Sequence, residues 1–338
     1  MVEWCRREIT EDGHEFWLWE PPMPRIPDRH LDVVIYLFPT EKAAEKGSEE
    51  GGSGFLVTVP SAIQSVEHVY AVTNKHVKEV ASTIRFRTAD GKSVVRQSHR
   101  KEWMDHPDGT DVSAFYLGFS TQLPNARAFS REIFLTEANC KKFNVGIGDE
   151  VYMIGRFLKY ERKRINEPTL RFGNIVMNAT SIPDAGLGPQ LSFLVEMRSL
   201  SGYSGSPVFL YMSPIHGRDG GEFPAPEESG WLLGINRGHI PYDEVVIDGK
   251  GKKVSDYHVE TNVGIAAVVP AWKILELLEG DVPTKQRKQK DTALAKEVAK
   301  NPIKPDAAIV PGVTREQFMK DLETVVRRGR RPRGAKSK

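Results

Sequence analysis

The chain has 338 residues, of which 39% are hydrophobic and 27% are charged, a balance that is ordinary for a globular protein and excludes collagen, coiled-coil and wholly disordered classes. The formal net charge is only +2, yet residues 285–338 carry 16 Lys and Arg against 6 Asp and Glu. The rest of the chain therefore sums to −8, which predicts an acidic globular body followed by a basic tail.

Hydropathy and cysteine content predict a compartment. No run of about 18 apolar residues occurs, so no membrane span is expected, and the charged segment 1–10 does not resemble a signal peptide. Only Cys5 and Cys140 are present, and they lack the spacing of a thiolate zinc site or a disulfide framework. We therefore expect a reducing, cytoplasmic location.

In chain order, an N-terminal extension (1–29) precedes a region (30–280) of short β-type runs separated by Gly, Asn, Asp and Pro. A hairpin is predicted at 245–259 and a closing helix at 271–279. This pattern favours an all-β barrel or sandwich over an α/β sheet. The eleven predicted strands are 31–38, 54–59, 68–73, 82–87, 112–117, 150–154, 173–179, 191–196, 207–210, 231–236 and 264–269.

Composition changes near residue 281, where a Gly, an Asp and a Pro precede a run rich in Lys and Gln. We place the end of the folded body there and assign 281–338 to a basic tail. Within the tail, residues 314–328 predict a short amphipathic helix, because three apolar side chains recur at i, i+4 and i+7.

The string GYSGSP at 202–207 lies between two predicted strands. A Ser between glycines is by itself typical of a tight turn. It also suits a nucleophile, because small neighbours let a substrate carbonyl approach Ser204 while the amides of Gly202 and Ser204 form an oxyanion hole. It is not the GxSxG elbow of α/β hydrolases, because Ser206 replaces the second Gly.

A serine nucleophile needs a base and a group that orients the base. His76 follows an apolar run that ends in a polar turn, and Asp111 begins another apolar run. Each has an ordinary interpretation as well. Eight other histidines occur, and Asp111 suits a turn, with Asp108 as a nearby competitor.

Together these motifs resemble the chymotrypsin-fold serine peptidases, most closely their HtrA-like (Deg) branch, over about residues 30–280. The His, Asp, Ser order along the chain is the order of that fold. The matching strings are TNKHV at 73–77, DVS at 111–113, GDEV at 148–151, GYSGSP at 202–207, GIN at 234–236 and the segment 264–270.

The resemblance implies two packed six-stranded antiparallel β-barrels, at about 30–120 and 145–270, with a cleft between them. It implies a serine endopeptidase acting on protein or peptide substrates without a metal or cofactor. In that scheme Ser204 attacks the scissile carbonyl, His76 transfers its proton and Asp111 orients the imidazole. The family's PDZ domain is not expected here, because the tail is too short and too polar.

The predicted substrate contacts are Arg198, six residues before Ser204, and Asn236, Arg237 and His239 on the strand after it. Because these side chains are polar or basic, a substrate Lys or Arg gains no ion pair from them, whereas a polar or acidic side chain is accepted.

Two other interpretations stay open. In the first, the barrels serve as a catalytically silent trypsin-fold binding module. In the second, the basic tail carries the main function by binding a regulatory protein partner, an anionic surface or nucleic acid. Metal catalysis has little support, because no HExxH or CxxC occurs and His99 with His106 lacks a ligand spacing. The physiological substrate, the activating signal and the oligomeric state do not follow from the sequence.

Overall fold

The computed structural model describes the chain from residue 26 to residue 300 with five gaps, of which the longest is 212–229. Two further strands, β1 (Cys5–Ile9) and β2 (Glu15–Trp19), pair with each other as a hairpin near the N-terminus. The predicted helix at 314–328 and most of the N-terminal extension lie outside the described residues. The described ranges are 26–47, 50–123, 126–158, 165–184, 186–211 and 230–300.

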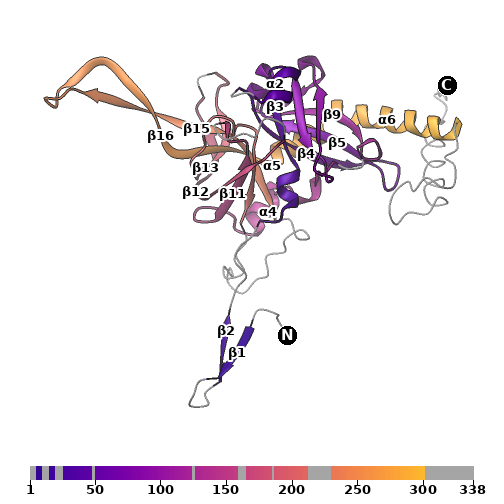
Figure 1. Cartoon of the computed structure of the whole chain (residues 1–338), viewed down its shortest axis with the longest axis horizontal. Helices are drawn as coiled ribbons and strands as arrows, with labels where there is room; N and C mark the ends of the chain where they lie inside the picture. The colour runs from indigo at the N-terminus through magenta and orange to yellow at the C-terminus, as the bar shows by residue number, and fades with distance from the viewer. Residues whose placement is uncertain are drawn as a thin grey trace, which may run out of the picture.

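The first half of the body is a curled sheet of eight strands (Figure 1). Strand β3 reads Val-Ile-Tyr-Leu-Phe and is buried throughout, as expected for β-branched and aromatic residues covered on both faces. A short strand, β10 (Phe129–Ser130), pairs in parallel with β4. The other strands, in sheet order, are β7 (Ser93–Gln97), β6 (Thr83–Arg87), β3 (Val34–Phe38), β4 (Gly52–Pro60), β5 (Glu67–Thr73), β9 (Ser113–Phe119) and β8 (Met104–Asp105).

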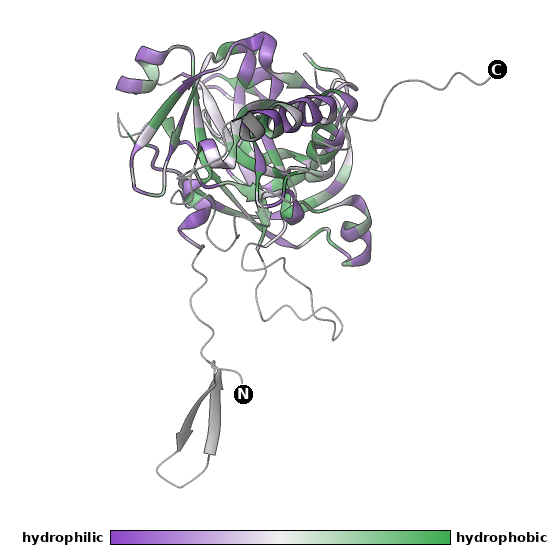
Figure 2. Cartoon of the chain, turned by 90° about the vertical axis from the view of Figure 1, so that its right-hand side faces the viewer, coloured by the Kyte–Doolittle hydropathy of each residue, from purple (hydrophilic) through white to green (hydrophobic). Residues whose placement is uncertain are grey.

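The second half is a closed six-stranded barrel, an arrangement that leaves no exposed sheet edge around its wall. In Figure 2 hydrophobic residues, drawn in green, gather inside the body. One hydrophobic cluster joins the two halves, because Tyr36 and Phe55 of the first pack with Tyr152 and Phe209 of the second. The barrel order is β11 (Glu150–Gly155), β12 (Thr169–Ile182), β13 (Gln190–Glu196), β16 (Lys253–Pro270), β15 (Leu232–Ile247) and β14 (Pro207–Leu210).

The predicted all-β class with two curled sheets is confirmed. The second barrel has the predicted six strands, whereas the first sheet has eight. The surplus comes from strands such as β8 and β10, which are two residues long and leave no alternating pattern in the sequence. The predicted hairpin at 245–259 is present as the far part of β15 and β16.

Helices cap and close the sheets. The closing helix α5 (Ala271–Glu279) buries Ile274, Leu277 and Leu278 in the cluster that joins the two halves. No helix in the described part of the chain combines the length and apolar character needed to cross a bilayer. The other helices before α5 are α1 (Arg29–Asp32), α2 (Glu41–Lys46), α3 (Lys75–Val80) and α4 (Glu137–Lys142), with 3-10 turns η1 (Arg100–Glu102), η2 (Ser120–Gln122) and η3 (Arg131–Ile133).

The chain does not leave the body at residue 281, as its composition suggested. It continues as helix α6 (Asp281–Lys300), which lies against the first sheet (Figure 1). Asp291 of α6 is buried, lies 2.9 Å from Nε2 of buried His68, and accepts the Ser61 hydroxyl at 2.7 Å. Composition does not indicate that this helix belongs to the folded body, because polar contacts rather than a broad apolar stripe hold it against the sheet.

Candidate active site

His76 lies just after the end of strand β5, at the junction of the two barrels. The strand ends at Thr73, Asn74 follows, and His76 is the second residue of α3. The Asn74 side-chain NH₂ donates to the Asp111 carbonyl at 2.9 Å, and the Thr73 hydroxyl donates to the Ser53 carbonyl at 2.7 Å. The residues around the histidine therefore fix the end of the strand that positions it.

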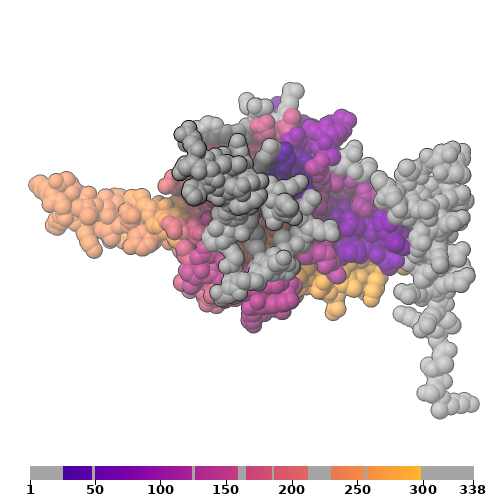
Figure 3. All heavy atoms as spheres, turned by 90° about the horizontal axis from the view of Figure 1, so that it is seen from below, coloured from indigo at the N-terminus to yellow at the C-terminus, as the bar shows by residue number. Residues whose placement is uncertain are grey.

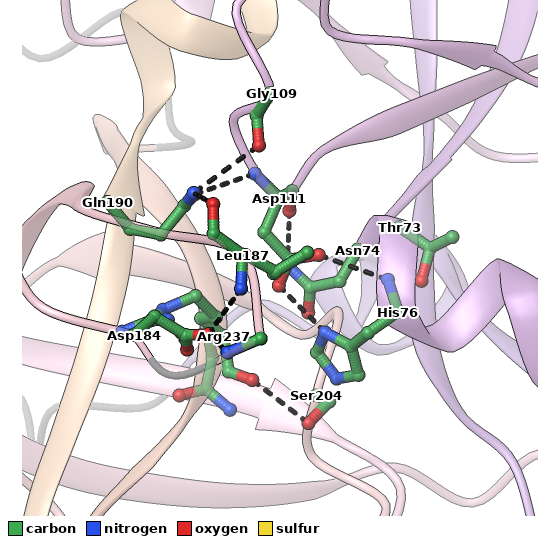
Figure 4. Close-up of polar contacts among 12 residues, drawn as sticks. Thr73, Asn74, His76, Gly109, Asp111, Asp184, Leu187, Gln190, Ser204 and Arg237 are labelled. Atoms are coloured by element: carbon green, nitrogen blue, oxygen red, sulfur yellow. Dashed lines mark hydrogen bonds and ion pairs between the residues drawn. The ribbon is translucent and has the colours of Figure 1, made fainter.

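Asp111 is fully buried just before β9 and contacts His76 twice. One carboxylate oxygen lies 2.7 Å from His76 Nδ1, and the other accepts the His76 backbone N–H at 3.0 Å (Figure 4). Because an ionised carboxylate only accepts hydrogen bonds, Nδ1 carries the proton and Nε2 is the free basic nitrogen.

Ser204 lies in the loop before β14, and in Figure 4 the imidazole of His76 faces it. In this structure the Ser204 hydroxyl donates to the carbonyl of Arg237 at 3.1 Å. Rotation about the Cβ–Oγ bond of Ser204 turns the hydroxyl proton from that carbonyl toward the imidazole that faces it. Such hydrogen bonds commonly tighten only when substrate is bound.

The loop that carries Ser204 adopts a backbone that requires glycine. Gly202 has φ of +99° and Gly205 has φ of +88°, in the left-handed region that residues with a side chain rarely adopt. A Cβ at Gly205 would lie 1.9 Å from the Ser53 carbonyl oxygen. Among the described residues, the amides of Gly202 and Ser204 have no acceptor, so both remain available to a developing oxyanion.

Ser53 of β4 ties this loop to the first sheet, a role that sequence analysis did not assign. Its hydroxyl donates to the Gly202 carbonyl at 2.7 Å and accepts the Arg156 N–H at 2.9 Å. Its own N–H donates to the Ser204 carbonyl at 2.8 Å. The only sequence signal is the string GGSGF, in which a small residue permits the close approach.

The predicted substrate contacts separate into two groups. Arg198 is exposed and does not line the cleft beside His76. Asn236 is buried and donates to the Ser199 hydroxyl at 3.0 Å and the Tyr203 carbonyl at 2.9 Å, so it supports the Ser204 loop from behind.

Arg237 and His239 do line the cleft, which has a volume of about 770 Å³. The Arg237 guanidinium forms an ion pair with Asp184, a residue that sequence analysis missed. Burial raises the pKa of the Asp184 carboxyl, but N–H donation from Leu187 and Gly186 and the Arg237 charge outweigh it, so the pKa lies below its ordinary value. The remaining lining residues are His76, Asp111, Ile182, Pro183, Gly186, Leu187, Gly238, Ile240, Pro241 and Ala267.

Asp108, the competitor of Asp111, belongs to a different cluster. It lies 2.6 Å from His106 Nδ1 and 3.0 Å from the Lys273 ammonium, which also contacts Glu276 at 2.7 Å. Burial raises the Asp108 pKa, but hydrogen bonds from Thr110 and Lys273 outweigh it and bring the pKa well below its ordinary value. A cationic side chain thus already occupies this acidic cluster.

Neither a protein-family model nor a curated protein sequence matches the chain. Among solved structures, the MamO protease domain from Magnetospirillum magneticum aligns with a TM-score of 0.44 and 14% identity, covering 73% of this chain and 96% of that one. The HtrA-type protease AlgW with a tripeptide gives 0.41 and 18%, covering 75% and 60%. The serine endoprotease from Yersinia pestis gives 0.40 and 16%, covering 76% and 66%. The chain therefore spans roughly two thirds or less of the length of the last two chains. These likenesses concern the fold and carry no conclusion about activity.

Proposed function

We propose that the protein is a serine endopeptidase that cleaves protein or peptide substrates through Ser204, His76 and Asp111. The observation that carries this proposal is the contact of His76 Nδ1 with buried Asp111 at 2.7 Å, on an imidazole whose other nitrogen faces Ser204. A buried carboxylate that fixes the tautomer and orientation of an imidazole next to a serine hydroxyl is the arrangement that activates a nucleophile.

The reaction follows from these positions. Ser204 Oγ attacks the scissile carbonyl carbon while its proton moves to His76 Nε2, and Asp111 stabilises the imidazolium. The carbonyl oxygen becomes an oxyanion that accepts hydrogen bonds from the N–H groups of Gly202 and Ser204. The peptide C–N bond then breaks and the amine leaves with the proton from His76. Water, activated by the same imidazole, hydrolyses the ester on Ser204 and restores the enzyme.

A fluorophosphonate probe tests the proposal directly, because it labels only an activated serine. We expect labelling of the wild type and of Ser201→Ala, an exposed serine in the same loop, and none of Ser204→Ala. Hydrolysis of an unfolded protein substrate should fall by about 10⁴-fold or more in Ser204→Ala and His76→Ala. A wild type that is folded but neither labelled nor hydrolytic would instead favour the silent binding module.

A further inference from the structure

Strands β15 and β16 extend beyond the barrel as a two-stranded arm, defined here as residues 241–262 (Figure 1, Figure 3). The arm projects from the body on the side away from α6, without a neighbouring element along it in these views. An isolated two-stranded ribbon is only marginally stable in water, so a long one that carries apolar side chains points to a partner that covers it.

One face of the arm near the barrel carries exposed apolar side chains. The register pairs Tyr242 with Thr261 and Glu244 with Val259, and directly opposed residues of an antiparallel pair share a face. Tyr242 is 56% exposed and Val259 is 52% exposed. We call these four residues the arm patch.

The opposite face is more polar, because Asp243 pairs with Glu260 and Val245 pairs with His258. The arm patch is therefore a distinct surface with an aromatic ring, a Val side chain, two hydroxyls and one carboxylate. The Thr261 hydroxyl lies 3.5 Å from that carboxylate, on Glu244.

The arm patch is continuous with the cleft. Ile240 lines the cleft, and Tyr242, the first residue of the arm patch, lies two residues further along the same strand. At about 3.3 Å per residue, Glu244 and its partner Val259 lie about 10 Å beyond Pro241. A polypeptide extended from the cleft reaches the arm patch with about three or four further residues.

We propose that the arm patch is an exosite that binds the part of an extended polypeptide substrate lying beyond the cleft, a proposal that rests on the peptidase function above. Apolar side chains of the substrate pack on Tyr242 and Val259, and a Lys or Arg pairs with Glu244. Recognition is through side chains, because Pro241 has no N–H to offer to a strand added along β15 at that point.

The test compares hydrolysis of short and extended peptides by the full chain. The probes share one cleavable core and carry, at either end, a six-residue extension containing two Leu and one Lys, or the same extension with Ser in place of Leu. For the wild type we expect the Leu-containing extension at one end to raise kcat/KM at least tenfold over the core, mainly through KM. The Ser-containing extension should give less than half of that gain.

Two variants of one residue type on opposite faces provide the control. Val259→Ser should remove most of the gain, whereas Val245→Ser should keep it, and both should cleave the short core at the wild-type rate. Equal rates on core and extended peptides, or an equal loss in both variants, would overturn the exosite. So would a change of sedimentation coefficient in Val259→Ser, because it would make the patch a contact between copies. Absence of hydrolysis of every peptide, including the core, would instead contradict the peptidase function.

Discussion

The side-chain carbonyl of Gln190, at the start of β13, accepts the backbone N–H of Asp111 at 2.9 Å. The NH₂ of the same buried side chain lies 3.3 Å from the carbonyl oxygens of Gly109 and Leu187. A residue of the second barrel thereby holds the loop that presents the acid of the first sheet, and ties it to the cleft loop that contains Asp184.

Replacing Gln190 with Ala should lower kcat by about 10- to 100-fold with little change in KM, because a displacement of about 1 Å in catalytic geometry has that cost. Gln190→Glu retains an acceptor for the Asp111 N–H but lacks the NH₂ that donates to the Gly109 and Leu187 carbonyls, so it should not restore the wild-type kcat. Steady-state kinetics, with kcat and KM determined separately, provide the measurement.

The control is Gln97→Ala, whose exposed side chain donates to Glu41 and does not line the cleft. Its kinetics should match the wild type. Wild-type kcat in Gln190→Ala would show that the contact does not position the acid.

Gln190 also marks the limit of sequence-based reasoning for this fold. The strings around His76, Asp111 and Ser204 are local signals, because each residue lies in a short segment next to a strand end, and the adjacent residues determine the turn there. The strands themselves follow from β-branched and aromatic runs between turn residues. Gln190 lies 79 residues from Asp111, and nothing adjacent to it distinguishes it from any polar residue that opens a strand.

The same limit explains Arg198 and Asp184. The distance of Arg198 along the chain from Ser204 predicts a place in the cleft, but the direction of a side chain depends on the local loop, and here the side chain is exposed. Asp184 reaches the cleft through a loop after β12, where no pattern in the sequence fixes the path of the chain.

The ion pair between Arg237 and Asp184 predicts how the cleft selects charge. Asp184→Asn leaves the Arg237 guanidinium without its anionic partner, so kcat/KM for a peptide with Glu relative to one with Lys should rise about tenfold, or about 1.4 kcal/mol. A peptide library profiled with both proteins provides the measurement. Asp90→Asn, in a turn between β6 and β7, should leave the ratio unchanged. A wild-type profile dominated by Lys or Arg would contradict the expected selectivity.

His30 predicts an acid-side loss of stability. Its ring lies 5.3 Å from that of Phe209, its Nδ1 lies 3.0 Å from the Tyr152 hydroxyl, and it is only 1% exposed. Burial, assisted by the Arg29 charge, lowers the pKa of His30 to about 4. The unfolded state therefore binds this proton more tightly, so the stability is complete above about pH 6.5 and falls as pH drops toward 4.

Chemical unfolding of His30→Phe at pH 7 and pH 4 measures this effect. The loss of unfolding free energy on acidification should be about 3 kcal/mol smaller than in the wild type, since one pKa unit corresponds to about 1.4 kcal/mol. His99→Phe, at an exposed position, should behave as the wild type does. An equal acid-side loss in His30→Phe and wild type would refute the assignment.

Helix α6 should matter for stability and not for chemistry. Every proposed catalytic residue lies before residue 280, which by itself predicts that truncation there leaves hydrolysis intact. In the structure, such a truncation removes Asp291 of α6. His68, which lies on β5, the strand that leads to His76, then stays buried without its carboxylate partner.

We therefore expect the free energy of unfolding of a chain ending at residue 280 to be about 1–3 kcal/mol lower than that of a chain ending at residue 300, while both cleave a short peptide at the same rate at 20 °C.

The variant Asp291→Asn in the full chain tests the contact between Asp291 and His68 while the rest of the helix is kept. Burial raises the Asp291 pKa, but bonds from His68, Ser61 and the Ala62 N–H outweigh it and lower the pKa. The stability that Asp291 contributes is thus present above about pH 4 and lost as pH falls through the folded pKa. If truncation at 280 abolished hydrolysis in a protein that is still folded by circular dichroism, α6 would be required for catalysis and the prediction would be wrong.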